Sequence, residues 1–257
     1  MKIIVTQEQL EYFLLILVRM ASFASIAPFF GHANVPARYK VGLAACLSLM
    51  IYTLIGSQPL EYATVWDYGR FVIIEAIAGM LIGLSANLCV MIISFAGRII
   101  DMEIGLSMNT LYDPTTRQEM SVSGNFYYYG VLFLMLVSNM HYFLLSAMID
   151  SYSLIPIGGA VFNESLQDIF VGFLTEYFII GFRICLPVFA VAVLMNCIMG
   201  IMTKVAPQIH MFSVGLQLKV LAGLLVIFVT IPLLPVISEF IFNVMQRMVL
   251  TTMKGLY

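Results

Sequence analysis

Long apolar runs without a charged residue alternate with short charged connections along most of this chain. Six such runs occur, at residues 20–37, 41–60, 76–97, 120–149, 184–203 and 220–238. Each is near or above the roughly 20 residues that a helix needs to cross about 30 Å of hydrocarbon. The runs are continuous and lack the period of two that marks the strands of a membrane β-barrel. The pattern therefore predicts an all-α, polytopic membrane protein with about six apolar helical segments.

The composition agrees with this fold class. Hydrophobic residues make up 61% of the chain and charged residues only 10%, with a mean hydropathy of +1.00, whereas soluble domains carry roughly 25% charged residues. Six segments and their connections leave no room for a separate soluble domain, so we expect one domain over residues 1–257. Glu8, Glu11 and Arg19 interrupt the stretch where a signal peptide would be apolar, so we expect the first segment to persist.

Several classes of function find no support in the residues. A net charge of −2 and the absence of a basic run exclude a nucleic-acid partner. The four cysteines show no CxxC spacing, and His32, His141 and His210 lie far apart, so no metal site is predicted. No motif typical of a hydrolase, a phosphate-binding loop or a dinucleotide site occurs. We expect no enzyme activity, no cofactor and no metal.

The stretch 98–124 is a polar interruption between two apolar runs. It contains the Asp113-Pro114 turn signal and six charged residues, which are Arg98, Asp101, Glu103, Asp113, Arg117 and Glu119. Lipid cannot satisfy such a segment, so it must lie in water at the membrane face or line a cavity within protein.

Small residues on the third apolar run predict close helix packing. Gly79 and Gly83 stand four residues apart, and Gly97 and Gly105 follow. Glycines with this spacing share one helix face and let another backbone approach closely. Chance glycines in a membrane helix that tolerates them remain an equal alternative.

Charged residues next to or inside apolar runs need an explanation. Glu75 begins an uncharged run and is costly unless it is paired, protonated or facing water. An ion pair or exposure at the membrane edge is favoured over a proton relay. Arg183 is expected to pair with a carboxylate or with backbone carbonyls, and Lys219 to extend toward the interface. Arg19 belongs to the same group of buried or assembly-forming charges.

Prolines predict bent or broken segments. Pro28, Pro36, Pro187 and Pro207 lie within or beside the apolar runs, and each removes a helical hydrogen bond. At membrane depth such breaks often line a path.

Taken in order, these features resemble one family. The order is Arg19, Pro28, Val35-Pro36, Arg38, Glu75, Gly79, Gly83, Gly97, Asp101, Gly105, Asp113-Pro114, His141, Ser151-Tyr152, Pro156, Pro187, Ala206-Pro207, Phe212, Gly215, Lys219 and Gly223. It resembles the FliR family of flagellar export-apparatus proteins and their injectisome relatives, over nearly the whole length.

The resemblance implies a place in a larger assembly. Proteins of this family join FliP and FliQ subunits in a helical export gate, with FlhB around its cytoplasmic opening. The gate belongs to the flagellar basal body in the bacterial inner (cytoplasmic) membrane, and unfolded flagellar export substrates pass through its pore. Within that gate the apolar segments need not act as ordinary bilayer spans, and many form bent hairpins packed in the assembly above the membrane plane. Membrane lipid is a further expected partner.

The resemblance also implies a pore plug from the connection between the third and fourth segments. The matching positions are Met108, Asn109, Thr110, Leu111, Tyr112, Asp113, Pro114, Thr115, Arg117, Ser123 and Gly124. Arg98, Asp101 and Gly105 are expected to continue the third helix and anchor it. Without the resemblance, an ordinary surface loop would be the favoured interpretation.

Other functions remain open from the residues alone. An injectisome export-gate subunit is the nearest alternative. A stand-alone secondary transporter would rely on Glu75, Arg183 and the break at Pro207. An intramembrane enzyme ranks last, since the chain offers no candidate pair of nucleophile and base. Basic residues are split six against four between the two sides, so the membrane orientation stays undecided.

Overall fold

The computed structural model of the chain describes residues 6–32, 35–56, 60, 62, 64–109, 112–113, 118–119, 121–206 and 211–257. For residues 108–109, 112–113, 118–119 and 211–213 it describes the backbone alone.

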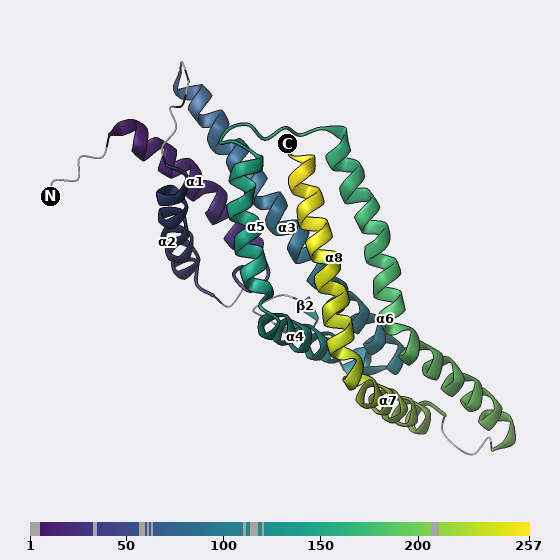
Figure 1. Ribbon diagram of the computed structural model, residues 1–257. Helices are drawn as coiled ribbons and strands as arrows, with labels where there is room; N and C mark the ends of the chain where they lie inside the picture. The colour runs from purple at the N-terminus through teal and green to yellow at the C-terminus, as the bar shows by residue number, and fades with distance from the viewer. Residues whose placement is uncertain are drawn as a thin grey trace. The chain divides into compact units, whose positions relative to one another are not determined.

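Helices account for nearly all of the described structure (Figure 1). In chain order the elements are α1 (Gln7–Ile26), α2 (Ala37–Ile55), α3 (Val65–Ile104), the 3-10 helix η1 (Leu106–Asn109), β1 (Tyr112–Asp113), β2 (Gln118–Glu119), α4 (Val122–Val137), α5 (Met140–Leu154), α6 (Glu164–Val205), α7 (Met211–Thr230), the 3-10 helix η2 (Ile231–Leu233) and α8 (Leu234–Gly255). The two short strands pair only with each other. The predicted all-α class is confirmed.

The described helices also agree with a polytopic membrane protein. Five stretches are long and apolar enough to cross a bilayer, namely α1, α2, α3, α6 and the α7–α8 stretch, and the bent pair α4 and α5 makes a sixth. Helices α3 and α6 contain 40 and 42 residues. At about 1.5 Å per residue, each is roughly 60 Å long, twice the thickness of the hydrocarbon core.

Helix ends differ from the ends of the charge-free runs. The run 20–37 falls mostly outside α1, which starts at Gln7 and includes three charged residues. A capping box between Thr6 and Gln9 begins this helix. It ends at Ile26, with Ala27 as its C-cap immediately before Pro28. The run 120–149 is divided at Asn139, whose backbone is left-handed. Local caps and prolines, rather than charge, therefore set these boundaries.

The chain divides into two compact units. The first comprises Met1–Leu88, Asn139–Phe173 and Asn243–Tyr257, and the second comprises Cys89–Ser138 and Leu174–Phe242. Helices α3, α6 and α8 each contribute residues to both. A single domain over residues 1–257 stays a prediction.

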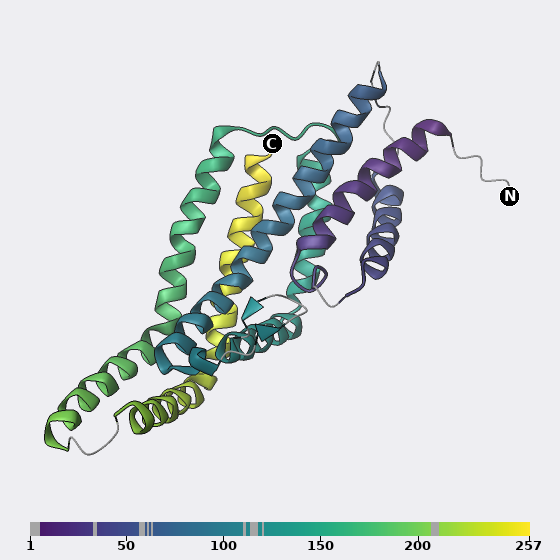
Figure 2. The same cartoon turned by 180° about the vertical axis from the view of Figure 1, so that it is seen from behind.

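In the first unit, α1 packs against α2 and against the N-terminal part of α3 (Figure 2). Leu15, Ile16 and Phe23 of α1 are buried. Gly79 and Gly83 on α3 allow the close approach of α1. A Cβ atom at Gly83 would lie 2.9 Å from the Phe23 carbonyl oxygen, and one at Gly79 would overlap the backbone of α1 at Arg19.

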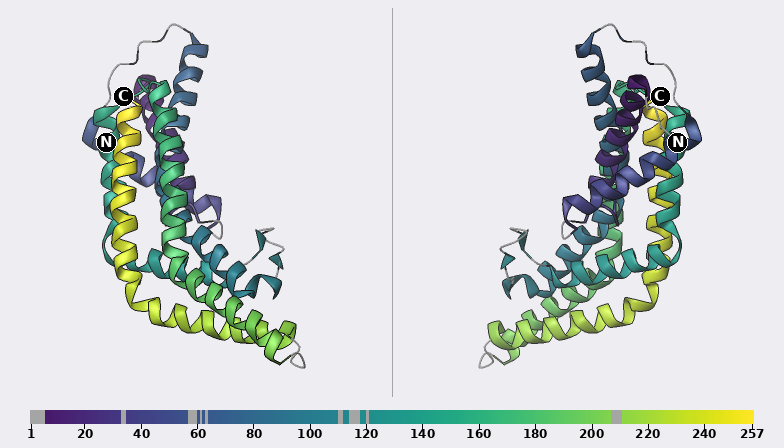
Figure 3. Two further views of the ribbon diagram at one scale, coloured as in Figure 1. Left: turned by 90° about the vertical axis from the view of Figure 1, so that its right-hand side faces the viewer. Right: turned by 90° about the vertical axis from the view of Figure 1, so that its left-hand side faces the viewer.

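In the second unit, α6 packs on the C-terminal part of α3 through aromatic rings. The Phe95 ring contacts the rings of Tyr177, Phe178 and Phe182, and a Cβ atom at Gly181 would lie 2.5 Å from the Phe95 ring. Helix α7 runs beside the C-terminal part of α6 (Figure 3). Many large apolar side chains on these two helices remain exposed, including Leu194 and Phe228.

The glycine contacts on α3 give a testable prediction. Replacing Gly79 or Gly83 by alanine places a methyl group against the backbone of α1, so the free energy of unfolding should fall by about 1–3 kcal/mol. Thermal unfolding of the purified protein in detergent measures this loss.

Gly69 provides the control within the same helix. A Cβ atom there would meet nothing within 4 Å, so Gly69→Ala should be neutral or stabilise by up to about 1 kcal/mol through helix propensity. Equal effects at all three positions would contradict the predicted close packing.

Candidate functional site

The connection between α3 and α4, residues 105–121, is the main polar interruption of the described helices. Gly105 ends α3 with a φ of +91°, a left-handed conformation that favours glycine. Helix η1 and the strands β1 and β2 follow, with Tyr112 opposite Glu119 and Asp113 opposite Gln118 in an antiparallel register. The described backbone after Gly105 is therefore short and irregular rather than a continuation of α3.

Asp101, one turn before the end of α3, holds the far end of this connection. Its carboxylate accepts a hydrogen bond from the Ser121 hydroxyl at 2.7 Å and from the Ser123 backbone N–H at 3.2 Å. Ser121 is the N-cap of α4 and accepts the Gly124 N–H at 2.9 Å. The carboxylate is buried and lies where the positive end of the α4 dipole favours an anion.

A backbone contact reinforces this attachment. A Cβ atom at Gly97 of α3 would overlap the backbone of Gly124 in the first turn of α4. At the other end of the connection, a Cβ atom at Gly105 would lie 2.6 Å from Leu216 of α7. We call the residues Gly97, Asp101, Ser121, Ser123 and Gly124 the segment anchor. It fixes the end of the connection that enters α4.

The predicted plug residues fall into three groups. Ser123 and Gly124 are buried in the first turn of α4 and belong to the segment anchor. Met108 and Asn109 lie in η1, and Tyr112 and Asp113 form β1. Thr110, Leu111, Pro114, Thr115 and Arg117 lie outside the described residues.

Sequence reasoning missed Ser121. A serine directly before an apolar helical run is a common N-cap signal, and it was available in the sequence. Its partner Asp101, twenty residues earlier in the chain, could not be inferred from that local signal.

A second buried polar cluster lies in the first unit. Arg19 of α1 and Glu75 of α3 are both fully buried and form a two-pronged ion pair, through Arg19 Nε to Glu75 Oε2 and through Nη2 to Oε1 at 2.9 Å. Arg19 Nη1 also donates to the Ile155 carbonyl oxygen at 3.1 Å. The Gly158 backbone N–H donates to Glu75 Oε1 at 2.8 Å.

An aromatic side chain of α5 completes this cluster. The Arg19 guanidinium carbon lies 4.4 Å from the centre of the Tyr152 ring, within the range of a cation–π contact. The Tyr152 hydroxyl donates to the Ile16 carbonyl oxygen at 3.1 Å. The pair thus joins α1, α3, α5 and the connection after α5. Both charged groups have the partners that burial requires, so Glu75 lies in an ion pair.

The remaining predicted site residues are dispersed. Arg98 and Arg183 are exposed, and Lys219 is half-buried. Pro28 follows α1 in a turn, Pro36 is the N-cap of α2, and Pro187 lies inside α6. Pro207 lies outside the described residues. Within the part of the chain that the structure describes, no group of three or more His, Cys, Asp or Glu side chains could hold a metal ion.

The ion pair predicts a large effect of removing one partner. Glu75→Gln leaves the Arg19 charge buried without a counter-ion, so the free energy of unfolding should fall by about 3–5 kcal/mol. The double variant Arg19→Met, Glu75→Leu should recover part of this loss, because an apolar pair has no charge to desolvate. Thermal unfolding in detergent compares the two.

Arg98→Gln, at an exposed arginine of the same helix, is the control and should change stability little. A Glu75→Gln protein as stable as the unmodified chain would show that the pair contributes nothing to stability.

The chain matches known proteins over most of its length. The family described as bacterial export proteins, family 1, matches residues 10–245. The chain is 30% identical over 248 residues to the flagellar biosynthetic protein FliR of Bacillus subtilis, covering 95% of this chain and 93% of the relative. It is 26% identical to FliR of Escherichia coli over 229 residues, covering 88% and 87% of the two chains. FliR of Aquifex aeolicus is 26% identical over 233 residues, covering 91% and 90%.

These matches extend over nearly the whole chain, and they confirm the resemblance drawn from the order of its prolines, glycines and charges. The chain therefore belongs to the FliR family of flagellar export proteins, within family 1 of the bacterial export proteins.

Proposed function

We propose that this chain is a structural and gating subunit of the flagellar type III protein export channel. It assembles with FliP and FliQ subunits, contacts FlhB, and lies in the bacterial inner membrane at the flagellar basal body. Unfolded flagellar subunits pass through the channel, and the connection 105–121 closes it when no substrate is present. The anchored connection is the observation that carries this proposal.

That connection is polar and lies between two apolar helices. A segment with irregular backbone between apolar helices must be surrounded by water or by protein. The segment anchor holds one end of it through the Asp101 carboxylate and the Gly97–Gly124 contact. A segment attached firmly at its base and filling a wet lumen can block a pore and still be displaced by a substrate.

Exposed apolar surface supports a role within an assembly. On α7, Leu221, Leu225 and Phe228 have more than half of their surface exposed, at 64%, 60% and 72%. Contiguous apolar surface of this kind marks contact with lipid or with other subunits. Neighbouring export-gate subunits are the partners that we propose for part of it.

The stand-alone transporter receives no support from the buried charges. That hypothesis relied on Glu75 as an ionisable group available to a solute or proton. The Glu75 carboxylate accepts hydrogen bonds from Arg19 and from Gly158, which favours a structural role.

Association with the other gate subunits is testable by co-purification. From cells that also express FliP and FliQ, an affinity-tagged chain extracted in mild detergent should carry both proteins at constant ratios. Gly83→Leu should reduce their recovery because it separates α3 from α1, whereas Gly69→Leu should not. Recovery of the unmodified chain as a stable lone monomer would contradict the proposal.

Closure of the pore is testable by permeability. Deleting residues 112–119 should make the assembled gate leak ions and small dyes, because the segment that fills the lumen is removed. A gate that contains Asp101→Ala should also leak ions and small dyes, but less than a gate that contains the deletion. The variant removes the acceptor of the Ser121 and Ser123 hydrogen bonds. A loss of about 1 kcal/mol raises the released fraction of the segment about fivefold.

Glu103→Ala is the matched control for Asp101→Ala. Glu103 lies two residues further along the same helix and is outside the segment anchor. A gate that contains Glu103→Ala should therefore be as impermeable as the unmodified gate. Co-purified FliP and FliQ report assembly in each variant. Full assembly with unchanged permeability in the deletion variant would refute the plug.

A further inference from the structure

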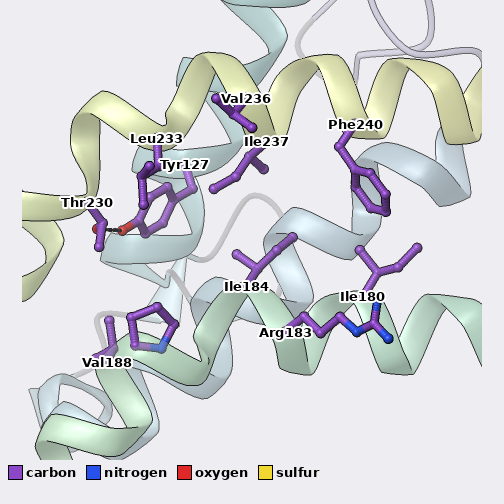
Figure 4. Close-up of a pocket in the computed structure, with 11 residues that line it drawn as sticks. Tyr127, Ile180, Arg183, Ile184, Val188, Thr230, Leu233, Val236, Ile237 and Phe240 are labelled. Atoms are coloured by element: carbon purple, nitrogen blue, oxygen red, sulfur yellow. Dashed lines mark hydrogen bonds between the residues drawn. The ribbon is translucent and has the colours of Figure 1, made fainter.

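An apolar pocket lies within the second unit, between α6 and the start of α8 (Figure 4). Its volume is about 270 Å³, and most of its wall consists of aliphatic and aromatic side chains such as Ile184, Ile237 and Phe240. Tyr127 of α4 closes one end.

Two prolines explain why the helices leave a pocket at this level. Pro187 lies inside α6, and Pro232 lies in η2 between α7 and α8. A proline donates no N–H to the carbonyl four residues earlier and its ring pushes that carbonyl away. In α6 that carbonyl belongs to Arg183. The 3-10 turn η2 interrupts the α7–α8 stretch, and the Pro187 ring lines the pocket itself, so the two sides do not interdigitate closely enough to fill the space.

Some polar groups of the pocket have hydrogen-bond partners within the protein, and one does not. The Tyr127 and Thr230 hydroxyl oxygens lie 3.0 Å apart, and Thr230 also donates to the Ile227 carbonyl oxygen at 2.9 Å. At the opposite end in Figure 4, the Arg183 side chain extends beside Ile180 and Phe240. No residue in the described part of the chain forms an ion pair or hydrogen bond with its guanidinium. Arg183 is therefore the polar group that the pocket offers to a ligand.

Arg183 directly precedes an uncharged stretch of α6. Residues 184–203 carry no charge, and Lys204 follows. The part of the pocket that α6 lines after Arg183 is therefore apolar, with Ile184, Pro187 and Val188 in its wall.

We propose that this pocket binds an anionic phospholipid. One acyl chain occupies the apolar pocket, and the phosphate accepts hydrogen bonds from the Arg183 guanidinium. The proposal does not depend on the gating function, since it concerns a different surface of the chain.

The chemistry of the pocket favours a lipid over a protein side chain. A guanidinium binds phosphate oxygens in a forked geometry that suits a headgroup. The pocket wall beyond Arg183 contributes no further unsatisfied donor or acceptor among the described residues, so it suits a ligand whose remaining length is hydrocarbon. Phe240 in the pocket wall is exposed, as lipid-facing residues are.

Fluorescence quenching by brominated lipids tests this site. The chain has one tryptophan, so Trp66→Tyr with Phe240→Trp leaves a single reporter in the pocket. The full-length protein is reconstituted with phosphatidylglycerol or phosphatidylcholine brominated on the acyl chain. Half-maximal quenching should need about fivefold less of the anionic lipid, equivalent to about 1 kcal/mol for one cation near the headgroups.

Substitutions at Arg183 assign the preference to its charge. Arg183→Gln should abolish the difference between the two lipids, and Arg183→Lys should keep most of it. Arg98→Gln removes an exposed arginine of the same unit that does not line the pocket, so it should keep the full preference. Because Arg183 is exposed, these variants should fold normally.

Three outcomes would overturn the proposal. Equal quenching by both lipids would show that the pocket does not select a headgroup. A preference that survives Arg183→Gln would place the selection elsewhere. Absence of quenching by either lipid, together with loss of co-purified FliP or FliQ in Arg183→Gln, would identify a protein carboxylate as the partner of Arg183.

Discussion

The need to pair each buried charge between apolar helices governs this structure. A charge buried between helices is stable only with a counter-charge and hydrogen bonds. Arg19 and Glu75 meet this requirement together, with the help of the Ile155 carbonyl and the Gly158 N–H. Asp101 meets it through Ser121 and the N-terminus of α4. In each case the pairing determines which helices lie side by side.

The sequence predicted the fold class because hydrophobicity acts locally. A run of twenty apolar residues forms a helix in a membrane whatever its neighbours are. The ends of the helices were predicted less well. The charge-free runs omitted residues 7–19, thirteen of the twenty residues of α1, because charged residues such as Arg19 interrupt the apolar pattern although they lie in the helix. The partner of Arg19 on α3 neutralises it, and that partner is 56 residues away in sequence.

In the candidate site, too, the sequence predicted the residue types but not the contacts between residues that are distant along the chain. The glycines at 97 and 124 are visible in the sequence, but their mutual contact is a property of the folded chain. The polar composition of residues 98–124 predicted a segment that lies in water or lines a cavity within protein. The antiparallel register of β1 and β2 and the carboxylate cap on α4 depend on how α3 and α4 meet, which no periodicity records.

The contact between Gly97 and Gly124 has a consequence for how this family could change over time. The two helices meet there through backbone atoms, with no side chain between them, so rotamers do not influence their separation. The spacing at the base of the connection is thus independent of the residues at its tip. Changes of length or sequence between these two glycines therefore leave this backbone contact itself unaltered.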